Sequence, residues 1–132
     1  MGKIVSISLI VVFLVFACNR KLPSDFSSGE FACDFCRMQI VDLRFKAEAV
    51  TKKGKVFRFD SIECLLDWQR EHQSEMRNAW VTDFYHPAQW IELKQAYILK
   101  SKTLPSPMGG FLSAYATEQD FEKARKEFGG KP

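Results

Sequence analysis

The pattern of hydrophobic and polar residues divides the chain into three regions. Residues 4–17 are almost entirely apolar and follow a single basic residue, Lys3. Such a run is too short to cross a bilayer comfortably and has the form of a secretory signal. Residues 18–30 are polar and contain Pro, Ser and Gly, which is typical of a tether. We therefore expect a signal peptide over residues 1–17, a tether over 18–30 and a folded domain over 31–132.

Alternating residues between positions 44 and 59 predict a β-hairpin. Apolar and polar residues alternate in RFKAEAV and again in VFRF, and a Lys-Lys-Gly-Lys turn at 52–55 separates the two runs. A helix is expected over residues 61–72, because apolar residues recur there on one helical face. Asp60 is its predicted N-cap, with Glu63 closing a capping box.

The second half of the chain shows a similar succession of strands and a helix. Thr117 is the predicted N-cap of a second helix, which ends near Phe128, before a Gly-Gly pair. The pattern predicts an α+β fold: a small single domain of antiparallel strands with two short helices, in which a ββα-type unit is duplicated. The expected strands of this half are 79–85, 89–93, 96–100 and 110–116.

Composition narrows the possible partners and supports one compact domain. The chain has 19 Lys and Arg residues against 16 Asp and Glu residues, a net charge of +3, and no basic stripe. This balance argues against nucleic acid as a partner. The 12 Phe residues supply material for a hydrophobic core.

The end of the apolar run looks like a bacterial lipobox. In Val-Phe-Ala-Cys, a small residue directly precedes Cys18, although Phe16 is bulkier than usual at its position. If the resemblance holds, Cys18 becomes the lipidated first residue of the mature protein. The alternatives are an ordinary secreted protein and an uncleaved membrane anchor. All three place the domain outside the cytoplasm.

The sequence Cys33-x-x-Cys36-x-Met38 is the strongest candidate for chemistry. The C-x-x-C spacing lets a turn bring two thiols together, and if Cys36 to Met38 is extended, their side chains share a face. Thiolate and thioether sulfur are ligands that Cu(I) prefers. Apart from Cys18, the chain has three cysteines, Cys33, Cys36 and Cys64, which is an odd number. We expect Cys64 to be a buried apolar residue of the first helix. A Cys33–Cys36 disulfide beside an inert Cys64 is the alternative.

Two further residues are candidate metal ligands. Met108 lies in Leu-Pro-Ser-Pro-Met-Gly-Gly, a loop whose prolines exclude a central strand and whose glycines allow close approach. A methionine exposed in such a loop is poorly explained by packing, although a lone Met more often fills a gap in a core. His86, between Tyr and Pro, would add a nitrogen ligand; the alternative is a turn histidine hydrogen-bonded to solvent.

Taken in order, these motifs resemble the NosL family, the accessory lipoproteins of nitrous oxide reductase. The resemblance is carried by C-x-x-C-x-M after a lipobox, then by FDSIECLL, TDFYHPAQWIELKQAYILKS and LPSPMGGFLSAY. It runs from about Cys18 to Gly130, and the order of the blocks is more specific than any one block. The resemblance implies a fold of two ββαβ-like halves, which agrees with the duplicated pattern.

The resemblance also implies a function. Members of the family are outer-membrane-anchored proteins that bind Cu(I) and deliver it to the reductase. Nitrous oxide reductase, or another copper-accepting apoprotein, is therefore the expected partner. The expected location is the bacterial cell envelope, lipid-anchored to the outer membrane and facing the periplasm or the surface. The implied metal ligands, with His86 added as the candidate nitrogen ligand, are Cys33, Cys36, Met38, Met108 and His86.

The sequence departs from the family motifs at two positions. Arg37 replaces a glycine of the C-x-x-C-G-M motif, so the turn after Cys36 can differ. Ser106 stands between two prolines, where the family usually has Thr-Pro-Met. Neither departure removes a candidate ligand, but together they leave room for a relative that supplies copper to a different client.

Two other functions are compatible with the same residues. A thiol–disulfide oxidoreductase would use Cys33 and Cys36, although redox C-x-x-C motifs usually open a helix and strands are expected to follow here. A structural zinc site would combine these two cysteines with Cys64 and His86, but there is no second C-x-x-C pair. No set of nucleophile and base appears in the sequence, and we expect a protein that is not an enzyme.

Overall fold

The structure is a computed structural model, in which residues 23–132 are described. The predicted signal peptide, residues 1–17, and Cys18 lie outside the described residues and stay predictions. Within residues 23–132, no helix is both long and apolar enough to cross a membrane. In chain order, with the 3-10 helix as η1, the elements are β1 (Ala47–Thr51), β2 (Val56–Phe59), α1 (Ile62–Glu71), β3 (Met76–Thr82), β4 (Trp90–Glu92), η1 (Leu93–Gln95), β5 (Tyr97–Lys100), β6 (Leu112–Tyr115) and α2 (Glu118–Phe128).

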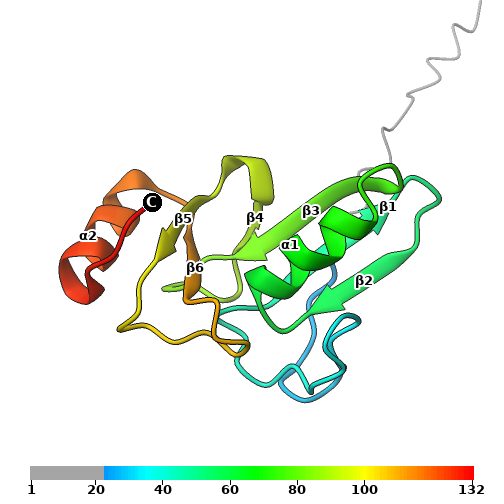
Figure 1. Ribbon diagram of the computed structural model, residues 1–132, viewed down its shortest axis with the longest axis horizontal. Helices are drawn as coiled ribbons and strands as arrows, with labels where there is room; N and C mark the ends of the chain where they lie inside the picture. The colour runs from blue at the N-terminus through cyan, green and yellow to red at the C-terminus, as the bar shows by residue number, and fades with distance from the viewer. Residues whose placement is uncertain (1–22) are drawn as a thin grey trace, which may run out of the picture.

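The larger unit is a four-stranded antiparallel sheet, in the order β2-β1-β3-β4, with α1 across one face (Figure 1). The small residues Ala47, Ala49 and Ala79 belong to the same buried core as Leu65 and Trp68 of α1. Because small side chains stand on the sheet, the helix can approach it closely. This packing fixes the start of α1 beside the end of β2.

Residues 23–31 pack against the face of the sheet opposite α1. Phe26 is buried against Trp90, with ring centroids 6.4 Å apart. The buried Lys46 places its Nζ 2.8 Å from a carboxylate oxygen of Asp25 and 4.8 Å from the centre of the Trp90 ring. The packed domain therefore begins before the expected boundary at Phe31, and the C-terminal part of the predicted tether belongs to the fold.

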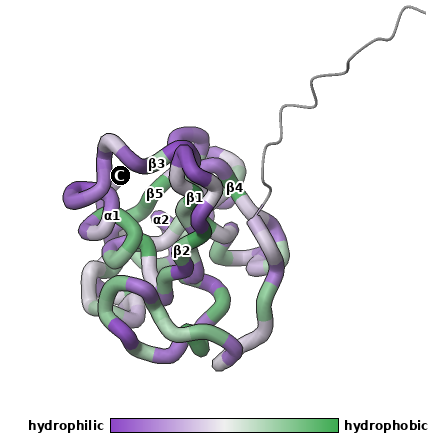
Figure 2. Tube along the Cα trace, turned by 90° about the vertical axis from the view of Figure 1, so that its right-hand side faces the viewer, coloured by the Kyte–Doolittle hydropathy of each residue, from purple (hydrophilic) through white to green (hydrophobic). Residues whose placement is uncertain are grey.

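The smaller unit consists of the antiparallel pair β5–β6 and α2, at the other end of the molecule from the four-stranded sheet (Figure 1). Tyr115 and Phe121 join Phe45 and Phe84 in a second, largely aromatic core. Along the described chain, hydrophobic and hydrophilic stretches follow one another (Figure 2). The first half is a ββαβ unit, whereas the second ends in an isolated bridge from Lys131 to β5.

The fold is α+β, as the sequence predicts, and most turns and caps lie where they were expected. Gly54, in the predicted turn between β1 and β2, has a φ of 84°, in the left-handed region that glycine adopts freely. Thr117 caps α2, and Gly129 ends it with a φ of 69°. The third strand is displaced: β3 runs over Met76–Thr82 rather than over 79–85.

The predicted cap of α1 is wrong by one residue. Ser61, not Asp60, is the N-cap, and its side chain accepts the Cys64 N–H at 3.3 Å. Glu63 closes no capping box; its carboxylate instead accepts hydrogen bonds from the loop that precedes β6, among them the Gly110 N–H at 3.0 Å. Asp60 is thereby free to point its carboxylate toward the C-x-x-C segment.

Candidate metal centre

The C-x-x-C segment forms a tight, hairpin-like loop. The Cys33 N–H donates to the Met38 carbonyl at 2.7 Å, and the Arg37 N–H donates to the Cys33 carbonyl at 2.9 Å. Arg37 has a φ of 69°, a conformation that suits glycine best. The turn thus forms with arginine at the position of the motif's glycine. Because the backbone reverses at Arg37, the segment from Cys36 to Met38 is not extended, and the expected shared face is absent.

Three cysteines and one carboxylate converge at the start of α1. One ligand atom from each of Cys33, Cys36, Asp60 and Cys64 lies within 4.8 Å of the others. The four residues, which we call the cysteine cluster, come from the C-x-x-C loop, the end of β2 and the first turn of α1. Cys36 donates its S–H to an Asp60 carboxylate oxygen at 3.4 Å. The packing of α1 on the sheet therefore builds the cluster.

Cys64 corrects the sequence prediction most directly. We expected a buried apolar residue of the first helix, and Cys64 is buried, but its sulfur also faces the other two thiols, as only the zinc alternative had assumed. All three of these cysteines are free thiols. The odd count of thiols, in a chain that the sequence predicts to be exported, was the one signal in the sequence that pointed to a role for the third.

The cluster holds its negative charge mainly on one sulfur. The Cys64 S–H donates to Cys33 and, together with backbone N–H groups of Cys36, Asp60 and Phe35, lowers the pKa of the Cys33 thiol to about 6. Burial raises the pKa of Cys36 to about 11. The same hydrogen bond to Cys33, together with burial, raises the pKa of Cys64. Near neutral pH the site therefore contains one thiolate beside two thiols.

This charge distribution predicts a measurable titration. In the metal-free, reduced protein, ultraviolet thiolate absorbance should rise in one step at a pKa of about 6, from Cys33. Cys64→Ala should move the step to higher pH, because it removes the S–H donor that stabilises the thiolate. The pKa of Cys33 is lower in the folded state than in the unfolded state, so ionisation of this thiol stabilises the fold. The stabilisation is complete above the ordinary cysteine pKa of about 8.5, and it is lost as the pH falls through the folded-state pKa of about 6.

Cys33→Ser is the control for this titration. Serine carries no thiol, so the step near the folded-state pKa of Cys33 should vanish while the titration of Cys36 at high pH remains. A low step that persists in Cys33→Ser would assign the thiolate to another cysteine and contradict the charge distribution.

The two candidate methionines lie on the surface near this cluster. Met38 and Met108 are 62% and 45% exposed. Their chain neighbours Gln39 and Pro107 line one cavity of about 280 Å³, to which Asp60 of the cluster also contributes. Both residues are thus reachable from solvent, and their chain neighbours line a cavity that Asp60 of the cysteine cluster also lines.

His86 lies in a different group. Its Nδ1 is 3.1 Å from the buried carboxylate of Asp83, and these two residues group with Asp120 rather than with the cysteines. Asp83 also accepts the backbone N–H groups of Tyr85, His86 and Ala116. The structure therefore does not bring the expected nitrogen ligand to the cysteine cluster, where Asp60 supplies an oxygen atom instead.

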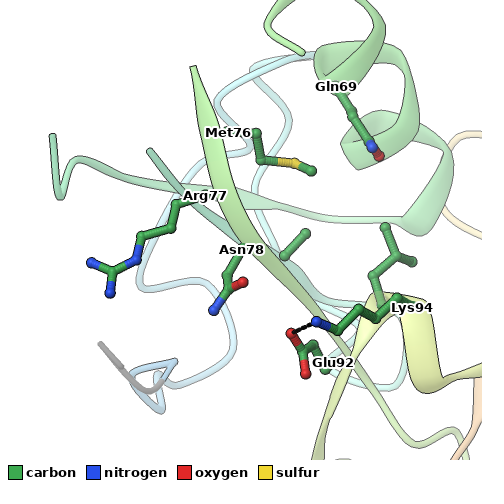
Figure 3. A pocket seen from close by; sticks show the side chains of 8 residues that line it. Gln69, Met76, Arg77, Asn78, Glu92 and Lys94 are labelled. Carbon is green, nitrogen blue, oxygen red and sulfur yellow. Dashed lines mark ion pairs between the residues drawn. The ribbon is translucent and has the colours of Figure 1, made fainter. Parts of the chain in front are cut away.

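A second cavity, of about 350 Å³, lies between the end of α1, β3 and η1 (Figure 3). Gln69 and Asn78 stand on opposite sides of it, and Lys94 forms an ion pair with Glu92 at 3.0 Å. Met76 supplies the only sulfur atom among its lining residues. This donor set is unsuited to a thiophilic metal, so the cysteine cluster remains the candidate site.

An α+β domain with a cluster of free thiols and exposed methionines nearby is a candidate binding module for a thiophilic metal. The profile of the NosL family matches residues 25–132, and the chain belongs to this family. The family resemblance expected from the motif order is thereby confirmed. The matched region starts at residue 25, in agreement with the packing of Phe26 into the fold.

The fold is similar to that of a solved NosL structure. The crystal structure of the copper chaperone NosL from Shewanella denitrificans superposes with a TM-score of 0.71 at 21% identity, over 83% of this chain and 90% of that chain. That protein is described as a chaperone, and membership of its family supports the expectation that this chain is not an enzyme. A comparison with curated protein sequences gives no match.

Proposed function

We propose that this protein is an exported Cu(I) carrier that binds copper at the cysteine cluster and passes it to an apoprotein. The convergence of three free thiols in a NosL-family chain is the observation that carries the proposal. Soft thiolate ligands select Cu(I), and the solved relative is described as a copper chaperone. Copper is here the cargo of the protein rather than a resident cofactor.

Within the cysteine cluster, Cu(I) would bind first to the thiol that loses its proton most readily. Cys33 offers a thiolate near neutral pH, whereas Cys36 must release its proton to become a ligand. Cys33 and Cys64 are buried, and Cys36 is the most accessible of the three thiols. Cu(I) held between Cys33 and Cys36 would therefore stay reachable from the side of Cys36.

Release requires that a partner's ligand attack a site whose coordination is incomplete. The exposed thioethers of Met38 and Met108 bind metal without losing a proton, and the chain neighbours of both residues line the cavity to which Asp60 contributes. We assign them as ligands that hold Cu(I) at the surface during entry and transfer. A buried, four-coordinate site would suit structural metal better than cargo.

The partner and the location follow from the family and from the leader sequence. The proposed client is nitrous oxide reductase or a similar extracytoplasmic cuproenzyme. Lipidation at Cys18 would tether the domain to the outer membrane of a bacterial envelope, on the periplasmic or the outer side. Mass spectrometry of the mature protein, which detects a diacylglyceryl group on Cys18 and cleavage after Ala17, tests this part separately.

The carrier function is tested by anaerobic competition of the exported protein against a chromogenic Cu(I) chelator. We expect one tightly bound equivalent, weakened by Met38→Leu and by Met108→Leu. Met76→Leu is the matched control, because Met76 lines the distant cavity of Figure 3. Transfer is then measured as copper gained by the copper-free reductase after mixing.

Two results would contradict the carrier. If the protein fails to compete for Cu(I) and instead holds a readily reduced Cys33–Cys36 disulfide, an oxidoreductase is favoured. If Zn²⁺ binds more tightly than Cu(I) and exchanges slowly, the three sulfurs and Asp60 form a structural zinc site. The burial of Cys33 disfavours the first of these, because an external disulfide cannot reach that sulfur in the folded state.

A further inference from the structure

We propose that Glu63 is a positioning residue that holds the loop of Met108 against the candidate copper site. This inference rests on the proposed function and names a residue that would control it. The loop comprises residues 105–111 and is called the Met108 loop below. Glu63 lies in the first turn of α1, directly before Cys64 of the cysteine cluster.

The contacts between Glu63 and the Met108 loop are specific. The carboxylate oxygen Oε1 accepts the hydroxyl of Ser106 and the backbone N–H of Gly110, the latter at 3.0 Å. The Ser106 hydroxyl oxygen in turn accepts the Phe111 N–H at 2.8 Å, and the Ser106 carbonyl accepts the Gly109 N–H at 3.0 Å. One carboxylate oxygen therefore binds both sides of the turn that presents Met108.

The loop backbone lies directly on the Glu63 side chain. A Cβ atom added to Gly110 would lie 2.7 Å from the Glu63 carboxyl carbon and 2.8 Å from its Cβ and Cγ. Phe111, the next residue, has a φ of 62°, which is strained for an aromatic residue. A strained residue persists only where its surroundings hold it in place. Two hydrogen bonds hold Phe111: its N–H donates to the Ser106 hydroxyl, which Glu63 binds in turn, and its carbonyl accepts the Ser101 N–H at 2.9 Å.

The second carboxylate oxygen indicates that this residue is not optimised for stability alone. Glu63 Oε2 is buried and has no hydrogen-bond partner among the described residues. A buried acceptor without a partner costs free energy, which an apolar residue of similar size would avoid. Holding the Met108 loop beside the cluster accounts for a polar residue here, because only an acceptor can bind Ser106 and Gly110 together.

The position of the contact links the loop to the metal-binding residues. Ser106 and Pro107 line the same cavity as Asp60 of the cluster. Glu63 and Cys64 are consecutive residues of α1, so the loop and the buried sulfur are fixed to the same turn of helix. Without the carboxylate, Met108 would sample more conformations, and a thioether must be ordered to serve as a ligand.

A double-mutant cycle on the exported protein tests this role. Cu(I) affinity is measured by chelator competition for wild type, Glu63→Ala, Met108→Leu and the double variant. We expect Glu63→Ala to weaken Cu(I) binding by about tenfold, as is common when a residue that orients a ligand is removed. In the Met108→Leu background the same change should have little further effect, because Glu63 acts through Met108.

Three additional measurements separate positioning from folding. Glu63→Gln keeps an acceptor oxygen and should retain most of the affinity, and Glu71→Ala, an exposed change on the same helix, should have no effect. In metal-free Glu63→Ala, hydrogen exchange of the Gly110 and Phe111 amides should accelerate, while that of Ala116, bound to Asp83, should not change. The exchange measurement requires no copper binding.

The outcomes distinguish failure of this inference from failure of the proposed function. Additive effects of Glu63→Ala and Met108→Leu, or unchanged exchange at Gly110, would overturn the positioning role although copper still binds. A wild-type protein that binds no Cu(I) would overturn the proposed function and, with it, the copper-related part of this inference. If the effects of Glu63→Ala and Met108→Leu on Cu(I) affinity are not additive, and the Gly110 and Phe111 amides exchange faster in Glu63→Ala, the proposed function and the positioning role are both supported.

Discussion

Cys33→Ser is expected to weaken Cu(I) binding by about a hundredfold to a thousandfold, which corresponds to about 3–4 kcal/mol. Cys33 is the thiol of the cluster whose pKa is lowered, to about 6, chiefly by the hydrogen bond from Cys64. Serine is nearly isosteric, but its hydroxyl is a poor ligand for a soft cation and does not ionise near neutral pH. The measurement is anaerobic competition with a Cu(I) chelator at neutral pH.

Replacing each of the three cysteines by serine should weaken Cu(I) binding by a different amount, and the order of these losses tests the geometry of the cluster. Cys36→Ser should also weaken binding, because Cys36 is the accessible member of the cluster. Cys64→Ser keeps a hydroxyl that can donate to Cys33, so it should reduce the affinity less than Cys33→Ser does. Equal losses for all three variants would instead indicate a site that uses all three sulfurs. An unchanged affinity in Cys33→Ser would show that copper binds elsewhere.

The pH dependence follows from the same charges. At neutral pH, binding by Cys33 and Cys36 displaces mainly the proton of Cys36, whose pKa is raised to about 11. As the pH falls through the pKa of Cys33, a second proton must leave before copper binds, and the affinity should fall more steeply. The same titration in Cys33→Ser should lack this change of slope.

The sequence allowed the local features of the fold to be predicted, because these depend on neighbours in the chain. The hairpin turn at Gly54, the Thr117 cap and the end of α2 at Gly129 are each determined by the conformational preferences of a few residues. The packing of Phe26 could not be predicted in this way. Phe26 lies in a polar stretch, and its burial depends on Trp90, far along the chain.

Only the part of the candidate site that depends on neighbours in the chain could be predicted from the sequence. The spacing of Cys33 and Cys36 is a local signal, and both belong to the cluster. Cys64 fits the apolar face of a helix equally well, so periodicity alone assigned it to the core. Only the junction of β2 with α1 shows that its sulfur faces the C-x-x-C loop. Asp60 was assigned to the cap that Ser61 provides, which concealed its contact with Cys36.

The second large effect concerns stability. Asp83→Ala is expected to reduce the free energy of unfolding by about 3–5 kcal/mol, as is typical when one partner of a buried charged network is removed. The Asp83 side chain is fully buried, and Oδ1 accepts the Tyr85 and His86 N–H groups, each at 2.9 Å. Its Oδ2 accepts the Ala116 N–H at 2.7 Å, which ties the turn after β3 to the junction of β6 and α2.

Urea denaturation followed by tryptophan fluorescence measures this effect, and two variants interpret it. Asp83→Asn keeps an acceptor oxygen and should lose less stability than Asp83→Ala. His86→Ala removes a side chain that is 62% exposed, so it should cost less than about 1 kcal/mol. A loss as large in His86→Ala as in Asp83→Ala would show that the imidazole, rather than the backbone network, stabilises this turn. If His86→Ala binds Cu(I) with unchanged affinity, His86 is not a copper ligand, and its contact with Asp83 belongs to the fold alone.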